Sequence, residues 1–269
     1  MNLSGKVALI TGGGSGIGLA IAHAIAQQGC SIVLADIQKE ALVTAVDSIK
    51  KLNVKVLGIQ LDVADRDAVY SAAEQVDEHF GRLDFLFNNA GVGDAGTPLD
   101  QVSDTLFDWI VNVNLFGVMN VLKAFVPKIK KSGQGGHIVN TSSMAGLVMI
   151  PGWNVGLYSA TKMAVLALSL DLRDVLEKDN IRVSTLCPGF IQTNIEKNAI
   201  ALRPSELKDA APSFPKELAS SGMPAAKLAE IVIKGIENND PIIVTHPEFL
   251  PVVTEYHEKI QRAFRANYA

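Results

Sequence analysis

Residues that build disulfide frameworks and metal centres are scarce in this 269-residue chain. It has two cysteines, Cys30 and Cys187, which lie far apart in the sequence among apolar neighbours, and five scattered histidines. Such a pair does not make a disulfide framework, and free thiols are typical of a reducing compartment, so we expect a cytoplasmic protein. The histidines lack the spacing of metal ligands, and we therefore expect no metal site.

Positive charge and long apolar runs are scarce as well. The formal net charge is -4, and charged residues make up only 19% of the chain. Because binding to a phosphate backbone needs a basic face, we do not expect nucleic acid as a partner. No run of 18 or more apolar residues occurs, and the N-terminus lacks the layout of a signal peptide. We therefore expect no membrane association and no export.

What the chain does contain is a regular alternation of short apolar runs and helical patterns. The apolar runs predict strands at 7–10, 32–35, 55–60, 83–87, 136–141, 182–186 and 242–244. The periodicity between them predicts helices at about 17–28, 65–80, 103–131, 158–178 and 224–238. This order predicts an α/β fold with a single domain over residues 1–269. It would be a Rossmann fold, with a doubly wound seven-stranded parallel sheet and helices on both faces.

The first predicted strand leads directly into a glycine-rich turn at the start of a helix. Its glycines are Gly12, Gly16 and Gly18, in the pattern Gly-x-x-x-Gly-x-Gly. A strand, a glycine turn and a helix place phosphate at the helix N-terminus, where free N–H groups and the helix dipole favour an anion. Glycine is needed because any Cβ would hold a pyrophosphate away from the backbone. The alternative is a plain flexible turn.

An acidic residue ends the second predicted strand. Asp36 at this position can accept hydrogen bonds from both hydroxyls of an adenosine ribose, and it would repel a 2′-phosphate. Neither Ser15 in the turn nor Ile37 after the strand is basic, so the pattern predicts NAD rather than NADP as the cofactor. The alternative is that Asp36 only caps the helix that starts near Gln38.

Tyr158 and Lys162 stand four residues apart in a predicted helix and therefore share one of its faces. A phenol with its ordinary pKa near ~10 is a poor base at neutral pH. An ammonium beside the phenol favours the phenolate and lowers the phenol pKa. Taken alone, the pair is also compatible with an ordinary helix surface.

Two stretches interrupt the alternation, and both follow strands directly. Residues 144–157 are nearly all apolar and contain proline and glycine, so we expect a loop. Residues 190–223 carry three prolines and mix charged with apolar residues, which is typical of a lid over a binding site. Both overhang the carboxyl ends of the strands, where open α/β sheets bind ligands. The substrate-binding residues expected from these stretches are Met144, Met149, Trp153 and Ile195.

The apolar character of these stretches predicts the class of small-molecule substrate. A hydrophobic secondary alcohol or ketone, aryl ones included, fits such a lining. The alternative is that some of these side chains pack in the core or in a subunit interface. Because Arg203 lies in the lid, a substrate with a carboxylate or phosphate is a further alternative.

The last segment, residues 247–269, spaces Phe249, Val253, Tyr256 and Ile260 at helical intervals. This predicts an amphipathic helix packed on the domain or on a partner subunit. A helix lying on a membrane surface is the less favoured alternative, because acidic and basic residues are mixed along the segment.

Several motifs together resemble the short-chain dehydrogenase/reductase family over essentially the whole chain. In the family's order and at about its spacing, they are Thr11-Gly12-x-x-x-Gly16-x-Gly18, Asp62, Asn88-Asn89-Ala90-Gly91, Asn114, Ser142-Ser143, Tyr158-x-x-x-Lys162 and Pro188-Gly189. The resemblance implies hydride transfer between C4 of a nicotinamide and a carbonyl or alcohol carbon. It also implies a homo-oligomer, a dimer or a tetramer, formed through the long helices around Asn114 and Lys162.

The resemblance places catalytic roles on Asn114, Ser143, Tyr158 and Lys162. Tyr158 would be the general acid/base, and Lys162 would lower its pKa and bind the nicotinamide ribose. Ser143 would donate a hydrogen bond to the substrate oxygen, and Asn114 would hold a water in a proton relay behind Lys162. An oxygen that gains charge on hydride attack needs such donors in place.

The catalytic serine is taken as Ser143 rather than Ser142. The family has a small residue three positions after this serine, and Gly146 stands three positions after Ser143. The gap from Ser143 to Tyr158 is longer than the family's commonest spacing, which we interpret as an insertion in the loop at 150–156. The alternative is that Ser142 takes the role.

The resemblance also implies a cofactor site along the strand ends. Asp62 and Val63 would contact the adenine, and Asn88 the adenosine side near the ribose. Ile191 through its backbone and Thr193 through its hydroxyl would hold the nicotinamide carboxamide. The full predicted set is Gly12, Ser15, Gly16, Ile17, Gly18, Asp36, Ile37, Asp62, Val63, Asn88, Ala90, Gly91, Tyr158, Lys162, Pro188, Gly189, Ile191 and Thr193.

The sequence therefore favours an NAD-dependent oxidoreductase acting on a hydrophobic secondary alcohol or ketone. One alternative is an NADPH-dependent ketoreductase of the same family. Another is a non-catalytic NAD-binding scaffold or sensor, but such proteins typically lose the Tyr or the Lys that Tyr158 and Lys162 keep here. An epimerase or dehydratase of the related extended group would have a longer chain and a different glycine spacing.

Overall fold

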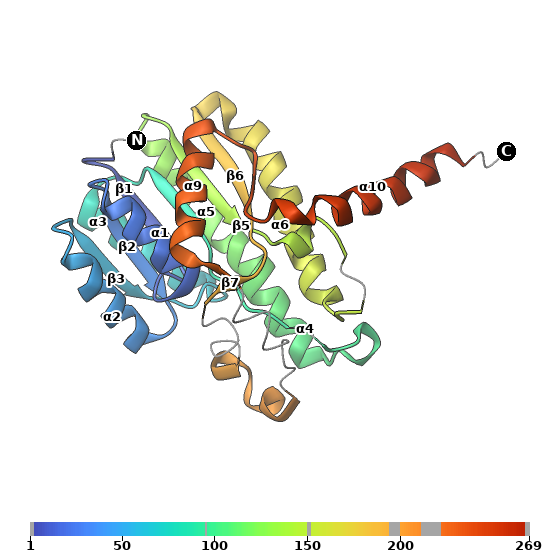
Figure 1. Ribbon diagram of the computed structural model, residues 1–269. Helices are drawn as coiled ribbons and strands as arrows, with labels where there is room; N and C mark the ends of the chain where they lie inside the picture. Colours follow the sequence, from blue (N-terminus) through green and yellow to red (C-terminus); the bar gives the residue numbers. More distant parts are fainter. Residues whose placement is uncertain (1–2, 95, 150–151, 194–199, 211–221, 267–269) are drawn as a thin grey trace.

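The computed structural model describes residues 3–94, 96–149, 152–193, 200–210 and 222–266 of the chain (Figure 1). At its centre is a sheet of seven parallel strands in the order β3-β2-β1-β4-β5-β6-β9. They are β1 (Val7–Thr11), β2 (Ser31–Asp36), β3 (Val56–Gln60), β4 (Phe85–Asn88), β5 (Gly136–Thr141), β6 (Ile181–Cys187) and β9 (Ile242–Val244). The expected doubly wound, seven-stranded Rossmann sheet is confirmed.

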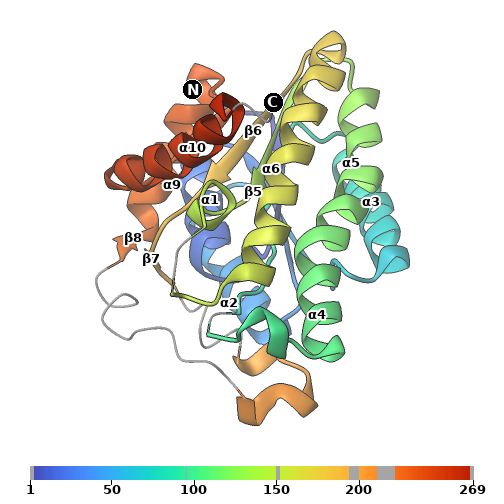
Figure 2. The same cartoon turned by 90° about the vertical axis from the view of Figure 1, so that its right-hand side faces the viewer.

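Helices cover both faces of this sheet (Figures 1 and 2). One face carries α1 (Gly16–Ala26), α2 (Lys39–Lys50) and α9 (Ala225–Asn238). The other carries α3 (Arg66–Phe80), α4 (Asp104–Val111), α5 (Val118–Lys131) and α6 (Gly156–Leu176). Helical crossovers between neighbouring strands keep every strand parallel, so all the strand ends that lead into loops of the site meet at one edge.

Alternate residues of each strand fill two separate cores. In β1, Val7 and Leu9 belong to the core beneath α3, α5 and α6, whereas Ala8 and Ile10 belong to the core beneath α1, α2 and α9. Burial on both faces explains why inner strands such as β1 and β2 are continuous apolar runs rather than alternating patterns. Each large aliphatic side chain buried in this way contributes about 1.5–3 kcal/mol to the stability of the fold.

The single long helix expected at 103–131 is confirmed as a continuous helical stretch, Asp104–Lys131, whose middle departs from the α-helix. After α4 the chain forms a π-helical segment, Asn112–Gly117, before α5 begins. Within the segment, Asn114 bonds back to the loop after β4, and Gly117 lies against Val63, where a Cβ would come within 2.7 Å. These two close contacts coincide with the widened turn, and π segments often occur at functional sites.

Asp104–Lys131, which spans α4, the π segment and α5, is long and apolar enough to cross a membrane by length and composition. Half of its apolar window is buried inside the protein. Val121, Phe125 and Ile129 of α5 pack into the core that α3 shares. The stretch therefore serves as a core helix of this fold.

The two ends of the expected lid, residues 190–223, lie side by side. Strand β7 (Ile191–Gln192) pairs with β8 (Met223–Pro224), with Ile191 opposite Met223. Between them the structure describes residues 200–210, which include the short helix Ser205–Ala210 (Figure 2). The segment is thus tied to the end of β6 on one side and to the start of α9 on the other.

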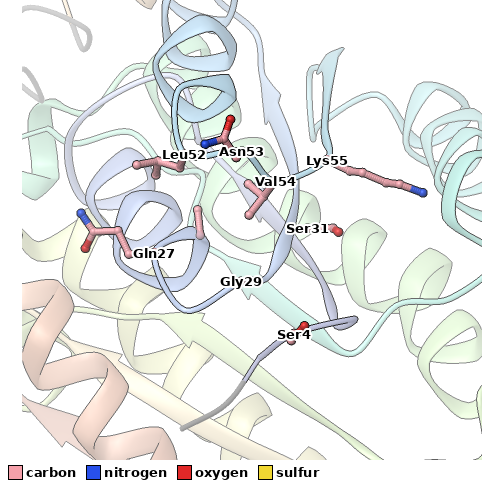
Figure 3. A pocket seen from close by; sticks show the side chains of 9 residues that line it. Ser4, Gln27, Gly29, Ser31, Leu52, Asn53, Val54 and Lys55 are labelled. Atoms are coloured by element: carbon pink, nitrogen blue, oxygen red, sulfur yellow. The ribbon is translucent and has the colours of Figure 1, made fainter.

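The strand order places a topological switch point at the carboxyl edge of the sheet. Strands β1 and β4 are neighbours from which the chain winds in opposite directions, and ligands of such sheets bind outside this point. A hollow of about 560 Å³ lies at the opposite edge, where Ser4, Gly29, Ser31 and Lys55 are among its lining residues (Figure 3). The hollow contains none of the predicted site residues, which lie at the ends of the strands on the carboxyl edge instead.

Candidate active site

The glycine turn between β1 and α1 makes close contacts that leave little room for side chains. Gly12 and Gly16 have φ angles of +64° and +54°, in the left-handed region that favours glycine. A Cβ on Gly12 would lie 3.1 Å from Cα of Ala90, and one on Gly16 would lie 3.2 Å from the side chain of Thr193. The turn is therefore enclosed by the chain after β4 and after β6. Its position at the N-terminus of α1 suits a diphosphate.

Asp36, at the end of β2, is held beside this turn. Its Oδ2 accepts the N–H of Gly14 at 2.9 Å, and its Oδ1 accepts the N–H of Gln38 at 2.9 Å. The helix cap of α2 is Gln38 itself, so Asp36 is not the capping residue. Gly14 escaped the sequence analysis, although a Cβ there would come 2.8 Å from the Asp36 carboxylate. Two other residues of the predicted cofactor site belong to this region. Ser15 in the glycine turn is partly exposed, and Ile37 directly after Asp36 is exposed.

Thr11 and Asn89 join three strand ends, a role that the motif alone did not reveal. The hydroxyl of Thr11 accepts the N–H groups of Asn89 at 2.9 Å and Ala90 at 3.0 Å. The Asn89 amide donates to the Thr11 carbonyl at 3.0 Å, and its oxygen accepts the Thr141 hydroxyl at 3.4 Å. These bonds fix β1, β4 and β5 relative to one another, so the cofactor cradle and the residues after β5 share one rigid edge.

Tyr158, Ser143 and Lys162 meet where the chain leaves β5 and enters α6. Tyr158 is half-buried, and the side chain of Ser143 lies near enough to its hydroxyl to lower the phenol pKa. Lys162 is buried one turn later. Its Nζ lies 5.7 Å from the centre of the Tyr158 ring and donates to the carbonyl of Thr141 at 3.0 Å. A phenol, a hydroxyl and an ammonium thus form one cluster, as the chemistry of a proton-handling site requires.

Burial dominates the protonation of this cluster. Desolvation raises the pKa of the Tyr158 phenol, and the hydrogen bond with Ser143 opposes that rise. Desolvation lowers the pKa of Lys162 to about 8, and the Cys187 thiol opposes that change. The net direction for Tyr158 is therefore upward in this structure, with removal from water as the largest cause. The lowering of the Tyr158 pKa by Lys162 stays a prediction. Burial also raises the pKa of Cys187 to about 12, which keeps it a thiol and not a nucleophile.

The structure separates the two adjacent serines by their partners. The Ser142 hydroxyl is buried and donates to the backbone carbonyl of Lys162 at 2.7 Å. The Ser143 hydroxyl accepts the N–H of Ala145 at 3.1 Å and reaches Tyr158. Gly146 lies between these elements, and a Cβ there would come 2.8 Å from the Lys162 carbonyl. Ser142 therefore ties β5 to α6, and Ser143 is the serine that faces the phenol.

Asn114 is buried in the π segment beside the same cluster. Its Oδ1 accepts the N–H of Val92 and its Nδ2 donates to the carbonyl of Val92, both at 2.8 Å. Gly91, just before Val92, has so little room that a Cβ would lie 3.2 Å from both Asn114 Oδ1 and Lys162 Nζ. The side chain thus fixes the loop after β4 next to Lys162. Its role in a water relay stays a prediction.

His246, which the sequence analysis left among the scattered histidines, holds the segment after β6. Its Nδ1 accepts the N–H of Gly189 at 3.2 Å, so Nε2 carries the proton and donates to the Phe190 carbonyl at 3.1 Å. The Pro188 carbonyl accepts the N–H of Met144 at 2.8 Å. The backbone is thereby fixed where the resemblance puts the nicotinamide, ahead of Ile191 and Thr193.

The predicted adenine residues lie at the ends of β3 and β4. Asp62 is exposed, and its Oδ1 accepts the N–H of Ala64 at 2.9 Å, while Val63 is buried. Asn88 is buried, and its amide donates to the Val118 carbonyl at 3.0 Å, which anchors β4 on α5. Contacts of these residues with a cofactor stay predictions.

The predicted substrate residues differ in their exposure. Met144 is buried and Met149 is exposed, and Ile195 lies outside the described residues. Trp153 is half-buried, with its ring centre 5.3 Å from that of Phe190. Phe190 is therefore a further apolar candidate, which the sequence analysis placed in the lid without a role.

Arg203, which made an anionic substrate an alternative, forms an ion pair inside the protein. It pairs with Asp94 at 2.6 Å, and each side chain is only 4% exposed. Asp94 lies in the loop after β4, three residues beyond Gly91. The charge of Arg203 is therefore already balanced by a carboxylate of the same chain.

Comparisons with known proteins agree with this geometry. The pattern of the family described as short chain dehydrogenase matches residues 6–203. A C alpha-dehydrogenase of Sphingobium sp. is 39% identical over 251 residues, which cover 90% of this chain and 81% of the relative.

Solved structures give the same result. A short-chain dehydrogenase/reductase of Burkholderia phymatum in complex with NAD has a TM-score of 0.90 and 34% identity, over 98% of this chain and 96% of its own. Carveol dehydrogenase of Mycobacterium avium in complex with NAD has a TM-score of 0.78 and 29% identity, over 90% of this chain and 95% of its own. The chain therefore belongs to the short-chain dehydrogenase/reductase family and is an oxidoreductase that acts on CH–OH groups with a nicotinamide dinucleotide.

Proposed function

We propose that the protein transfers a hydride between NAD(H), in preference to NADP(H), and a hydrophobic secondary alcohol or ketone, aryl ones included. The observation that carries the cofactor choice is the Asp36 carboxylate, held by the N–H of Gly14 at the glycine turn. Each of its oxygens keeps a lone pair for a ribose hydroxyl, and its charge repels a 2′-phosphate. The NAD complexes of the Burkholderia and Mycobacterium structures support the same choice.

The residues of this chain supply the proton side of the reaction. In the oxidation direction Tyr158, as phenolate, takes the hydroxyl proton of the substrate while the carbinol C–H bond breaks and the C=O bond forms. Ser143 donates a hydrogen bond to the same oxygen and orients it. The nicotinamide, when bound, supplies the acceptor for the hydride. Lys162 would bind the nicotinamide ribose, and its ammonium, one turn along α6 from Tyr158, would stabilise the phenolate.

The substrate class rests on the apolar side chains of the segments after β5 and β6 and on the ion pair that Arg203 forms with Asp94. Trp153 and Phe190 offer aromatic surface near the segment that His246 fixes. Asp94 neutralises Arg203, so this cation does not favour a carboxylate or phosphate on the substrate. The names of the C alpha-dehydrogenase and of carveol dehydrogenase are in keeping with a secondary alcohol carbon as the reacting centre.

The proposal includes a cytoplasmic homo-oligomer, a dimer or a tetramer. Large apolar side chains are exposed on the outer faces of α4, the π segment and α6, namely Phe107, Phe116, Leu170 and Val175. Exposed apolar side chains on neighbouring helices are typical of a subunit interface. A second copy of the chain is the partner that this surface fits.

The test is a panel of secondary alcohols and ketones, apolar, aryl and anionic, each assayed with NAD(H) and NADP(H) by the absorbance of the reduced cofactor. We expect turnover of apolar members with NAD(H) at the highest kcat/KM. Preference for NADPH with ketones would instead identify a ketoreductase. Binding of NAD without turnover of any member would identify a non-catalytic sensor.

A further inference from the structure

His246 lies two residues after β9 and is buried against the backbone of the segment that follows β6. Its exposed fraction is 6%, and that of Thr245 is 2%. A Cβ on Gly189 would come within 2.6 Å of Cγ of the His246 ring. The ring and the Gly189 backbone are therefore in close contact, which the absence of a side chain at residue 189 permits.

Both nitrogens of the ring hold a backbone group of this segment. Nδ1 accepts the N–H of Gly189 at 3.2 Å, and Nε2 donates to the carbonyl of Phe190 at 3.1 Å. The same carbonyl accepts the N–H of Met223 at 2.8 Å, so both of its lone pairs are used. The hydroxyl of Thr245 lies 2.6 Å from Nδ1 and 3.3 Å from the Gly189 nitrogen. The ring thus fixes the N–H of one residue and the C=O of the next.

The same segment is also tied to the loop after β5. The Pro188 carbonyl accepts the N–H of Met144 at 2.8 Å, and Met144 directly follows Ser143. A continuous series of contacts therefore leads from His246 through Gly189 and Pro188 to the residue beside Ser143. A shift of the ring would be felt at the predicted site for the substrate oxygen.

We propose that His246 is a positioning residue that places the nicotinamide for hydride transfer, a role that rests on the proposed function. Ile191 and Thr193, on which the resemblance places the nicotinamide carboxamide, directly follow the segment that His246 holds. By fixing Gly189 and Phe190, the ring sets where the carboxamide is bound, and with it the approach of nicotinamide C4 to the substrate carbon. A displacement of about 1 Å in such a geometry can lower the rate by about 10²-fold.

A purely structural role, in which the ring only joins the end of β9 to the end of β6, is the alternative. A structural role affects the whole dinucleotide site alike, whereas a positioning role concerns the nicotinamide half. The predicted contacts of the adenosine half lie at the ends of β2 and β3, and the sheet order puts these strands far from β6 and β9. ADP-ribose lacks the nicotinamide, so its binding separates the two roles.

The first test compares the affinities for NADH and for ADP-ribose, measured by calorimetry, in the parent and in His246→Leu. Leucine can neither accept nor donate a hydrogen bond, so the cofactor itself must order the segment. We expect about tenfold weaker binding of NADH and an affinity for ADP-ribose within about twofold of the parent. Equal losses for both ligands would indicate a structural role and overturn the proposal, as would unchanged binding of NADH. If the parent prefers NADPH, which would contradict the proposed coenzyme, the same comparison is made with NADPH and 2′-phospho-ADP-ribose.

The second test divides the two bonds between conservative variants. The amide oxygen in His246→Asn can take the place of Nδ1, and the amide nitrogen in His246→Gln can take the place of Nε2. Because each variant keeps one bond, we expect affinities for NADH between those of the parent and of His246→Leu, again with little change for ADP-ribose. Both variants decide the proposal even if His246→Leu does not fold. Parental binding of NADH by both of them would contradict it.

The third test measures the hydride-transfer step with a substrate deuterated at the carbinol carbon. A displaced nicotinamide slows the breaking of the C–H bond and leaves the other steps unchanged. We expect kcat for His246→Leu to fall by about 10- to 100-fold, with a deuterium isotope effect on kcat at least as large as that of the parent. An unchanged kcat or a smaller isotope effect would overturn the proposal. A parent without turnover of any substrate would refute the proposed function, and the binding comparison would still decide whether His246 places the nicotinamide.

The matched control is His257→Leu, at an exposed position of the C-terminal helix α10 (Leu250–Arg265). This helix projects away from the body of the protein and buries no side chain (Figure 1). Of the two packing arrangements expected for this segment, the one on its own domain is therefore not found in the described residues. We expect parental affinities and a parental kcat for His257→Leu. Losses as large as those of His246→Leu would show that the effect is not specific to His246 and would overturn the proposal.

Discussion

Arg203 and Asp94 form an ion pair 109 residues apart in the sequence, with both side chains almost fully buried. Arg203 belongs to the expected lid, and Asp94 to the loop after β4. Two residues before Asp94, both backbone groups of Val92 are bonded to Asn114. A continuous set of contacts therefore connects the lid segment to the residue that packs beside Lys162.

Loss of one member of this pair should release the lid segment. Asp94→Ala leaves a buried cation without a partner, which costs about 3–5 kcal/mol. We expect faster hydrogen exchange at residues 200–207 and a higher KM for an apolar substrate, with a smaller change in kcat. The double variant Asp94→Leu/Arg203→Met should recover much of the protection, because no charge is left buried. Strictly additive effects of the two single changes would show that the residues do not act as a pair.

The coenzyme preference should be reversed by two adjacent changes. Asp36→Ala removes the acceptor for the ribose hydroxyls together with the repulsion of a 2′-phosphate, and Ile37→Arg adds a cation at an exposed position. Hydrogen bonds to charged groups contribute about 1.5–3 kcal/mol each. We therefore expect the ratio of kcat/KM for NADP to that for NAD to rise by about 100-fold or more. Ile37→Arg alone is the control, and an unchanged ratio in the double variant would contradict the role of Asp36.

The two neighbouring serines should respond differently to the same change. Ser143→Ala removes a donor to the reacting oxygen, and loss of such a donor lowers kcat by about 10²–10³-fold. Ser142→Ala removes the bond to the Lys162 carbonyl, so we expect it to lower stability by about 0.5–1.5 kcal/mol. Steady-state kinetics and urea unfolding of both variants separate these effects. Inactivity of Ser142→Ala, with Ser143→Ala still active, would reverse the assignment.

Sequence patterns predicted the sheet well because its strands are buried on both faces. Val7 to Ile10 is a continuous apolar run for that reason, and the glycines that follow must lie at the carboxyl edge. The motif residues after each strand therefore meet at one edge without knowledge of any side-chain contact. The π segment around Asn114 could not be predicted, because a widened turn of six residues barely alters helical periodicity.

The bonds that fix the site were hidden by their separation along the chain. His246 and Gly189 are 57 residues apart, and nothing near His246 in the sequence marks it as a partner of that backbone. The direction in which the Tyr158 pKa shifts could not be predicted from the sequence either. Spacing shows that a lysine is near, but the pKa depends on how strongly burial opposes the charged form.

Removal of the phenol hydroxyl should stop the chemistry and leave cofactor binding largely intact. Tyr158→Phe keeps the ring but cannot exchange a proton with the substrate, so we expect kcat to fall by about 10²–10⁴-fold or more. Affinity for NAD(H), measured by fluorescence of the reduced cofactor, should change little. Tyr70→Phe, the same change at an exposed position of α3, is the matched control. Substantial turnover by Tyr158→Phe would refute the assigned acid/base role.

The contribution of Lys162 to stability should rise with pH above about 8. Burial lowers the pKa of Lys162 to about 8 in the folded protein, whereas the unfolded chain keeps the ordinary value near ~10.4. Between these two values the unfolded state binds more protons than the folded state, so the free energy of unfolding increases with pH, by at most about 1.4 kcal/mol per pH unit. Below about pH 8 both states are protonated, and the cost of the buried cation is fully present. Burial raises the pKa of Cys30 and of Cys187 to about 12, so these thiols act in the opposite direction above the ordinary thiol pKa near ~8.5, and the raised pKa of Tyr158 does so above ~10. The contribution of Lys162 is therefore the difference between two proteins that share these groups.

The measurement is urea unfolding at pH 7.5, 8.5 and 9.5, without added cofactor, on the parent and on Lys162→Met. Methionine has a similar length and no charge, so the parent should gain stability relative to the variant between pH 8 and 10, and the variant should be the more stabilised of the two at the lowest pH. Bound NAD should alter the profile of the parent more than that of the variant, because a ribose hydroxyl bonded to the ammonium favours its charged form. Parallel pH profiles for the two proteins would mean that Lys162 titrates alike in the folded and unfolded states, which its burial beside Tyr158 argues against.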